Sequence, residues 1–249
     1  MNKYNMVINV NSDYFAFAKI FFRSFFDNVD IKNLNKFYVF DCGLLEEERE
    51  WLSMFPFVEL KDTDLEYVKT NEVHGKEWSA ITYTKITNAK KILEQDNLPV
   101  FIFDVDSVFV QGFEDIIDFS NDVVCCRVRD DRLSQCPSSY IGSFVGFLNV
   151  QKSINFIDTW HNLIINSNDI KTAWRESPAL SILVNENRSS GQYKIQEIKE
   201  SIICSTLFSP KNTENVVNVH MKSEKGMGYS TTEERLRMPH VIGYIEKYV

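Results

Sequence analysis

Glycine and proline are scarce in this sequence, with 9 and 6 among 249 residues. So few turn-forming residues, together with the lack of any internal period, exclude collagen-like and other fibrous repeats. Basic residues are also outnumbered, because 27 lysines and arginines face 35 aspartates and glutamates and give a formal net charge of −8. Since a protein that coats a polyanion needs a basic face, we do not expect nucleic acid among its partners.

Long apolar runs are missing as well. No run approaches the ~20 residues that a membrane helix needs, and the opening residues, Met1 to Asn5, show no secretory or myristoylation pattern. The cysteines have neither metal-type nor disulfide-type spacing and are typical of reduced thiols. They are Cys42, Cys125, Cys126, Cys136 and Cys204. We therefore expect a cytoplasmic protein without a transmembrane segment.

Apolar residues are abundant, at 44% of the chain, and they include 19 phenylalanines and 10 tyrosines. This content supports a large buried core and excludes disorder as a description of the whole chain. The length suits one large domain or two small ones. Because no linker rich in proline or glycine divides the sequence, we expect one domain over 1–249 with two halves.

Apolar runs and helical patterns alternate over the first hundred residues. Strands are predicted at 6–10, 37–40, 57–60 and 99–103, with helices at 14–26, 45–55 and 79–95 between them. The apolar residues of the run 99–103 do not alternate with polar ones, which is typical of a central strand buried on both faces. This order predicts an α/β fold with a Rossmann-like half over about 1–110.

The second half, about 111–249, has a more mixed pattern. Strands are predicted at 122–128, 143–150, 193–198, 203–208 and 216–220, helices at 153–166 and 177–184, and loops at 129–140, 185–192 and 221–232.

Two acids, Asp104 and Asp106, directly follow the buried strand. Side chains two residues apart on an extended segment point the same way, so both carboxylates are expected at the carboxyl edge of the sheet, where such sheets bind ligands. Adjacent carboxylates repel each other unless a positive charge lies between them, and a hard divalent cation meets that need. The alternative is an ordinary strand end with solvated acids, because Asp-x-Asp is a common sequence.

Lys85 and His220 could serve the same site. Lys85 lies on or beside the apolar stripe of the helix before the acidic strand, so it could either snorkel to solvent or meet a phosphate at the sheet edge. His220 ends a predicted strand, and the loop after it carries Lys222, Lys225 and two glycines. An imidazole can ligate a metal and glycines let the backbone approach phosphate oxygens, although a histidine at a strand end is more often structural.

Together these motifs resemble those of glycosyltransferases of the GT-A fold, nearest to the glycogenin-like group that uses nucleotide sugars. The resemblance extends from the first strand to about Tyr229. It is carried by Asn11-Ser12-Asp13-Tyr14-Phe15 with Ser24, Tyr83-Thr84-Lys85, Phe103-Asp104-Val105-Asp106-Ser107-Val108, Ser143-Phe144-Val145-Gly146-Phe147-Leu148-Asn149, and His220 with Lys225. The chain departs from the family at Phe144-Val145-Gly146, where Asn-Ser-Gly is frequent, and at Glu176-Ser177, where Asp-Gln is frequent.

The resemblance implies a nucleotide-binding half joined to a mixed-sheet half that binds the acceptor and completes the metal site. It implies transfer of a hexose or pentose from a nucleoside-diphosphate donor, a UDP-sugar, to a hydroxyl of a glycan, a glycoprotein or a small molecule. Retention of the anomeric configuration is favoured. The metal would be held by Asp104, Asp106 and His220, and the imidazole favours Mn²⁺ over Mg²⁺.

The resemblance also implies roles for particular side chains. The donor-binding residues would be Asn11, Asp13, Tyr14, Asp41, Lys85, Asp104, Val105, Asp106, Gly146 and Lys225. Asp106 is in addition a catalytic candidate. An inverting reaction needs a carboxylate base, for which Glu176 is the best-placed candidate, ahead of Asp130 and Asp131. Helix capping and core packing are alternative explanations for Asp13, Asp41 and the aromatic residue Tyr14 or Phe15.

Two other functions remain open. An apolar strand followed by Asp104-Val105-Asp106 also resembles the first motif of haloacid-dehalogenase-type phosphatases, in which the first aspartate is a nucleophile and the second an acid/base. That motif normally opens its domain, whereas three predicted strands precede it here, and Asp130-Asp131 comes before any suitable lysine. The second alternative is a non-catalytic domain that binds a nucleotide sugar, against which the intact Asp104, Asp106 and His220 speak.

Overall fold

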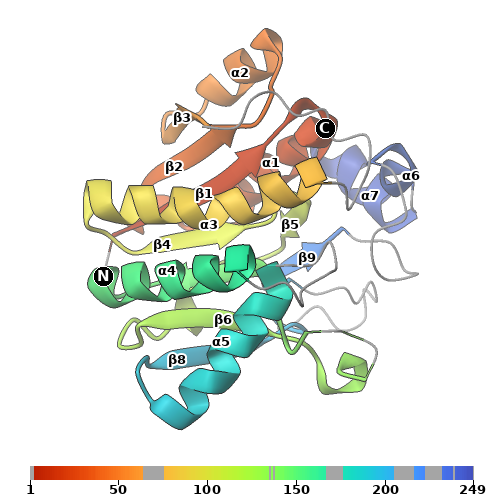
Figure 1. Cartoon of the computed structure of the whole chain (residues 1–249). Helices are drawn as coiled ribbons and strands as arrows, with labels where there is room; N and C mark the ends of the chain where they lie inside the picture. Colours follow the sequence, from red (N-terminus) through yellow and green to blue (C-terminus); the bar gives the residue numbers. More distant parts are fainter. Residues whose placement is uncertain are drawn as a thin grey trace.

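A seven-stranded sheet forms the centre of the protein (Figure 1). The computed structural model describes residues 3–63, 76–134, 136, 138–166, 176–204, 216–221, 232–237 and 239–248. The strands are β1 (Tyr4–Val10), β2 (Leu34–Asp41), β3 (Val58–Asp62), β4 (Val100–Phe103), β6 (Val123–Arg127), β7 (Tyr140–Phe147) and β8 (Ile195–Lys199), in the order β3-β2-β1-β4-β7-β6-β8. Among these strands only β7 runs antiparallel to its neighbours, so the sheet is mostly parallel.

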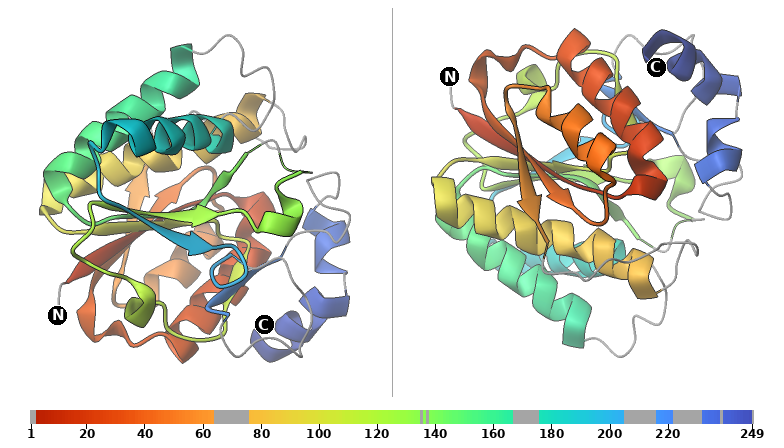
Figure 2. Two further views of the ribbon diagram at one scale, coloured as in Figure 1. Left: turned by 90° about the horizontal axis from the view of Figure 1, so that it is seen from below. Right: turned by 90° about the horizontal axis from the view of Figure 1, so that it is seen from above.

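Helices cover both faces of this sheet (Figure 2). One face carries α1 (Phe15–Asn28) and α2 (Glu46–Ser53), and the other carries α3 (Lys76–Asp96), α4 (Val150–Asn166) and α5 (Glu176–Ser190). The short helix α6 (Thr232–Leu236) and α7 (Pro239–Tyr248) lie at one end, where α7 packs on α1. Three-residue 3₁₀ helices are η1 (Ser12–Tyr14), η2 (Ile31–Asn33), η3 (Glu114–Ile116) and η4 (Asp130–Arg132).

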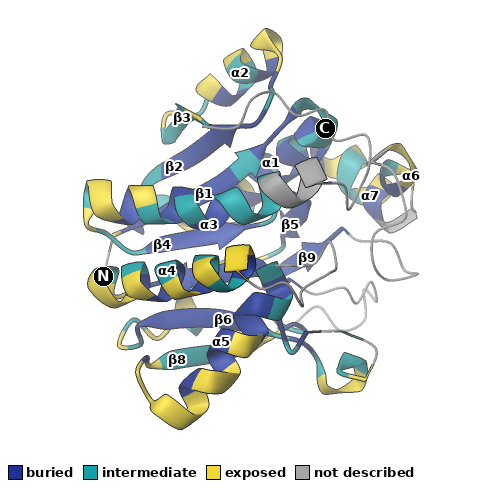
Figure 3. Ribbon diagram, viewed as in Figure 1, coloured by how far each residue is buried: buried dark blue, intermediate teal, exposed yellow. Residues whose placement is uncertain are grey.

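Alternate residues of β1 face two separate cores. Met6 and Ile8 pack toward α1, in a core rich in phenylalanine, whereas Val7 packs toward α3. Figure 3 shows the buried strands, and exposed residues on the outer sides of α2, α4 and α5. Burial on both faces explains why the strand sequences do not alternate. None of the helices in the described ranges is long and apolar enough to cross a bilayer.

Helix α1 is apolar nearly all round because two of its faces are covered. One face packs on the sheet through Phe21 and Phe25, and the opposite face contributes Phe17 and Ile20 to a third core with Val241 and other residues near the C-terminus. The helix predicted at 14–26 therefore lies between the sheet and α7.

The chain changes direction across the sheet at β1. It moves outward from β1 to β2 and β3, and then returns through α3 to β4 on the other side of β1. The carboxyl ends of β1 and β4 are therefore a topological switch point, where open α/β sheets bind their ligands. Beyond this edge, β5 (Ser107–Phe109) and β9 (Asn218–His220) form a separate two-stranded antiparallel sheet.

The structure corrects several sequence-based expectations. The loop predicted at 185–192 is wrong, because α5 continues to Ser190. The amide of the buried Asn187 bonds the backbone of Tyr193, which fixes the chain just after the helix. The strand predicted at 203–208 is not formed at residues 203 and 204, and its remainder lies outside the described residues. Strand β5 and the helices α6 and α7 were not predicted.

Candidate metal centre

The two acids leave the sheet at the end of β4, whose four residues are buried. The Asp104 amide donates to Ser143 O at 2.9 Å, so the backbone still follows β7 at this point before it turns into β5. The side chain of Val105 packs into the core beneath, while the side chains of Asp104 and Asp106 keep 25% and 10% of their surface exposed. A donor contact at Val105 would therefore have to use its backbone.

His220 reaches the acids through the small sheet. Strand β9 pairs with β5 so that His220 lies opposite Ser107, the residue after Asp106. The Met221 amide donates to Asp106 O at 2.8 Å and extends this pairing by one position. The buried imidazole then has its Nε2 2.8 Å from Asp106 Oδ1 and 3.8 Å from Asp104 Oδ2.

The three side chains have the geometry and chemistry of a small metal-ion site. One ligand atom from each of Asp104, Asp106 and His220 lies within 4.8 Å of the other two. Oxygen ligands about 2.1 Å from a small dication are about 4 Å apart across the ion, so the spread is close to that of one coordination shell. Two carboxylates with an imidazole suit Mn²⁺ or Mg²⁺, and the nitrogen favours the former.

Lys85 lies at the same edge of the sheet. Its Nζ is 2.5 Å from Asp104 Oδ1 and 3.4 Å from Glu176 Oε1, and only 4% of its side chain is exposed. Burial disfavours the ammonium form, but attraction to Asp104 and Glu176 outweighs it and raises the pKa of Lys85 above its usual value. The lysine therefore does not snorkel, and its charge is paired with the cluster.

Glu176 begins α5 and is held beside Lys85. Its backbone carbonyl accepts a hydrogen bond of 2.8 Å from the Trp160 indole, and the next residue, Ser177, accepts one of 3.0 Å from the Gly142 amide. A Cβ at Gly142 would lie 2.9 Å from Glu176 Oε1, so this position in β7 has space only for glycine while Glu176 keeps its place. No motif in the sequence marks Gly142.

Arg235, on α6, is a second buried cation of the cluster. It donates to Asp106 Oδ2, and its Nε and Nη2 donate to Met221 O at 3.0 and 2.7 Å. Burial opposes its charge, but Asp106 outweighs that effect and the pKa of Arg235 is raised. The sequence offered no signal for this residue, which lies beyond the segment that carries the family resemblance.

The residues after β1 and β2 fix turns of the backbone. Asn11 Oδ1 accepts a hydrogen bond from the Tyr14 amide at 3.2 Å and so caps η1, which contains the half-buried Asp13. Asp41 Oδ1 accepts hydrogen bonds from the Gly43 and Leu44 amides at 2.7 and 2.8 Å. Capping thus accounts for Asn11, and the turn after β2 accounts for Asp41. The Tyr14 ring lies 5.7 Å from the guanidinium carbon of Arg235.

No described contact brings Gly146, Asp130 or Asp131 to the metal centre. Gly146 lies inside β7, where a Cβ would come within 2.6 Å of the Phe101 ring, so packing accounts for the glycine. Asp130 and Asp131 are exposed and pair with Arg127 and Arg129. Lys225 and the glycines beside it lie outside the described residues.

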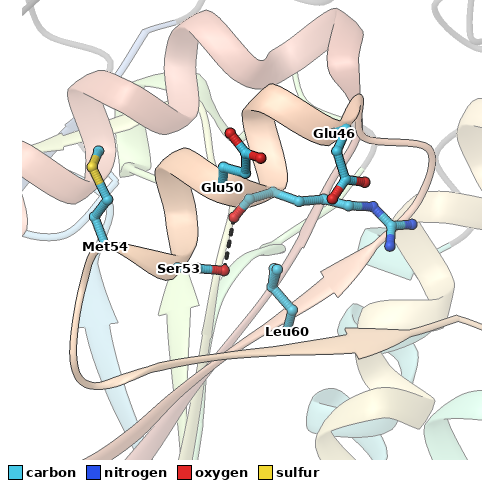
Figure 4. Close-up of a pocket in the computed structure, with 6 residues that line it drawn as sticks. Glu46, Glu50, Ser53, Met54 and Leu60 are labelled. Atoms are coloured by element: carbon cyan, nitrogen blue, oxygen red, sulfur yellow. Dashed lines mark hydrogen bonds between the residues drawn. The ribbon is translucent and has the colours of Figure 1, made fainter.

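An open hollow lies elsewhere, between α2 and β3 (Figure 4). Its lining residues are Glu46, Arg49, Glu50, Ser53, Met54 and Leu60. The Ser53 hydroxyl donates to Arg49 O at 2.8 Å, and the Arg49 guanidinium pairs with Asp41. These contacts stabilise the helix and the turn after β2.

Comparison with known proteins adds no assignment. No protein-family model matches the chain, and no curated protein matches it in sequence. The cluster of Asp104, Asp106 and His220 and its place in the fold are therefore the features that indicate a function.

Proposed function

We propose that this protein is a metal-dependent glycosyltransferase that moves a sugar from a nucleoside-diphosphate donor, a UDP-sugar, to an acceptor hydroxyl. The observation that carries the proposal is the convergence of Asp104, Asp106 and His220 within 4.8 Å at the carboxyl edge of the sheet. This edge adjoins the switch point between β1 and β4, where open α/β sheets bind nucleotides.

The strand order supports a GT-A fold. The four strands β3-β2-β1-β4 are parallel, as in a Rossmann-like nucleotide-binding half, and β7 then introduces an antiparallel neighbour. Such a change of direction is what a mixed-sheet half joined to the first half would produce. Both acids lie after β4, and His220 comes from the second half, so the cluster joins the two parts.

The charges of the cluster suit the departure of a diphosphate. A divalent cation bound here would supply Lewis-acid stabilisation of the negative charge that develops on the leaving group. Asp104 and Asp106 would hold it through oxygen and His220 through Nε2. Lys85, paired with Asp104 at 2.5 Å, adds a fixed positive charge at this edge.

The environment of Glu176 favours retention over inversion. An inverting enzyme needs a base that takes the proton of the acceptor hydroxyl. Glu176 Oε1 is paired with the buried ammonium of Lys85 at 3.4 Å, so this carboxylate already balances a charge within the cluster. A retaining reaction of this pattern needs no such base.

Three observations weigh against the phosphatase alternative. Asp104, its nucleophile, has one oxygen paired with Lys85, and His220, which lies beside both acids, would have no role in that chemistry. Three strands, β1 to β3, also precede the acidic pair.

A thermal-shift experiment on the full chain tests the proposal. A ligand that binds the folded state raises the unfolding midpoint by mass action. We expect UDP to raise the midpoint in the presence of Mn²⁺, and the effect to be lost with a chelator or in Asp106→Asn. Asp115→Asn, at an exposed acid in η3, is the matched control.

Turnover separates the alternatives. Release of UDP from a panel of UDP-sugars with acceptor hydroxyls would support sugar transfer. Hydrolysis of p-nitrophenyl phosphate that depends on Asp104 would instead support the phosphatase, and binding of UDP-sugars without turnover would support a non-catalytic domain. A shift that persists in Asp106→Asn would contradict the proposed site.

A further inference from the structure

Each of the two aspartates has one oxygen on a buried cation and the other oxygen toward the imidazole. Lys85 donates to Asp104 Oδ1, and Arg235 donates to Asp106 Oδ2. The opposite oxygens, Asp104 Oδ2 and Asp106 Oδ1, lie 3.8 and 2.8 Å from His220 Nε2. The oxygens that face the imidazole are therefore the ones nearest the third candidate ligand.

Arg235 is held in place by groups other than Asp106. Both Nε and Nη2 donate to Met221 O, the carbonyl of the residue after His220. Its guanidinium carbon also lies 4.5 Å from the ring centroid of Phe17 and 5.7 Å from that of Tyr14. A planar guanidinium with several fixed donors suits such a connecting position better than a flexible ammonium does. Arg235 thus joins Asp106 to the end of the strand that carries His220.

The charges around the acids show what Arg235 contributes. With a neutral imidazole, the carboxylates of Asp104, Asp106 and Glu176 exceed the two buried cations, Lys85 and Arg235, by one charge. Without Arg235 these carboxylates would share Lys85 alone. Repulsion would then favour rotation of the Asp106 side chain away from Asp104.

We propose that Arg235 is a positioning residue of this metal centre, which holds the Asp106 carboxylate with Oδ1 turned toward His220 and so increases the affinity of the site for a divalent cation. This inference rests on the metal centre of the proposed function and not on sugar transfer itself. A residue that orients a metal ligand by hydrogen bonding typically contributes to metal affinity although it does not touch the metal.

The same contact has an opposite interpretation, in which Arg235 competes with the ion for Asp106. The structure favours support over competition, because Arg235 binds Oδ2, whereas Oδ1 faces His220. An ion between Asp106 Oδ1, Asp104 Oδ2 and His220 Nε2 would leave the contacts of Arg235 with Met221 and Phe17 in place. The two interpretations predict opposite changes in affinity when the arginine is removed.

Titration of the full chain with Mn²⁺, followed by the electron paramagnetic resonance of the free ion, tests the inference. We expect Arg235→Gln to weaken Mn²⁺ binding about 10- to 100-fold, the usual range for removal of such a supporting residue. Arg235→Lys, which keeps the charge but not the fork of donors, should restore part of the affinity. Arg237→Gln is the control, because Arg237 is exposed and pairs with Glu233.

The unfolding midpoint of each variant, measured in a chelator, separates positioning from folding. A lower unfolding midpoint of Arg235→Gln with unchanged Mn²⁺ affinity would show that the arginine has only a structural role, and it would overturn the inference. Unchanged or tighter Mn²⁺ binding by folded Arg235→Gln would also overturn it. If Arg235→Gln does not fold, Arg235→Lys tests the inference instead. Weaker Mn²⁺ binding by Arg235→Lys would support the inference, and unchanged binding would contradict it. If the unsubstituted protein binds no Mn²⁺, the inference and the proposed function fail together, whereas binding without sugar transfer affects the proposed function alone.

Discussion

Asp106 Oδ1 lies 2.8 Å from His220 Nε2, although 114 positions separate the two residues in the sequence. The contact does not depend on the side chains alone, because β5 and β9 pair beside it and Met221 N bonds Asp106 O. Backbone pairing therefore sets the distance between the imidazole and the acids before any ion binds.

Replacement of the imidazole tests this arrangement directly. His220→Gln should weaken Mn²⁺ binding by at least about tenfold, since removal of a ligand should cost no less than removal of a residue that orients one. The unfolding midpoint in a chelator reports separately on the fold. His161→Gln, at a half-buried histidine beside Tyr83, is the control and should bind Mn²⁺ as the unsubstituted protein does.

Loss of Lys85 should lower stability in a defined pH range. Lys85→Met leaves Asp104 and Glu176 without their shared cation and should lower the unfolding free energy by about 3 kcal/mol, at the low end for a buried pair because Asp104 is a quarter exposed. Because the folded pKa of Lys85 is raised above its unfolded value, the stabilisation is fully present below about pH 10.5 and is lost as pH rises through the folded value.

Denaturant unfolding at several pH values checks this prediction. Lys91→Met, at an exposed lysine of the same helix, is the matched control. A difference between the unsubstituted protein and Lys85→Met that grows above pH 10.5 would show that the sign is wrong.

Substitution at Gly146 distinguishes packing from a role in donor binding. Gly146→Ala places a Cβ 2.6 Å from the buried Phe101 ring and should cost about 1–3 kcal/mol of stability through overpacking. The affinity for UDP with Mn²⁺, measured where the variant is folded, should not change. Gly243→Ala, where a Cβ meets nothing within 4 Å, is the control and should stabilise α7 slightly. Weaker UDP binding by folded Gly146→Ala would restore the donor-binding interpretation.

The thiols should differ in reactivity. Cys42, Cys125, Cys126 and Cys204 are buried, whereas Cys136 is partly exposed. Burial raises the pKa of the Cys42 thiol to about 12 and also raises the pKa values of Cys125 and Cys126. A thiol reagent near neutral pH should therefore label Cys136 in the folded protein and all five cysteines after unfolding, which mass spectrometry would show. Rapid labelling of Cys125 in the folded state would contradict this burial.

The strands up to β4 could be predicted because their evidence is local, in runs of apolar residues separated by helix signals. The placement of Asp104 and Asp106 at the carboxyl edge followed from the same pattern. Strand β5 could not be predicted in this way, because its three residues pair with Asn218–His220 far along the chain. Arg235 belongs to no motif, and its importance appears only when α6 is folded against Met221. The need for glycine at position 142 likewise becomes clear only when the Glu176 side chain is placed beside it.

The position of α1 ties the end of the chain to the candidate site. Arg23 donates to Tyr248 O at 2.7 Å, and Asn28 donates to the Tyr248 hydroxyl at 3.1 Å. These two hydrogen bonds hold the end of α7 against α1. Removal of α7 would expose Phe17 and Ile20, which are fully buried in the intact protein. The resulting apolar surface patch would favour self-association. Because Phe17 also supports the guanidinium of Arg235, truncation or a bulky fusion near Tyr248 would disturb the ion-binding residues from a distance.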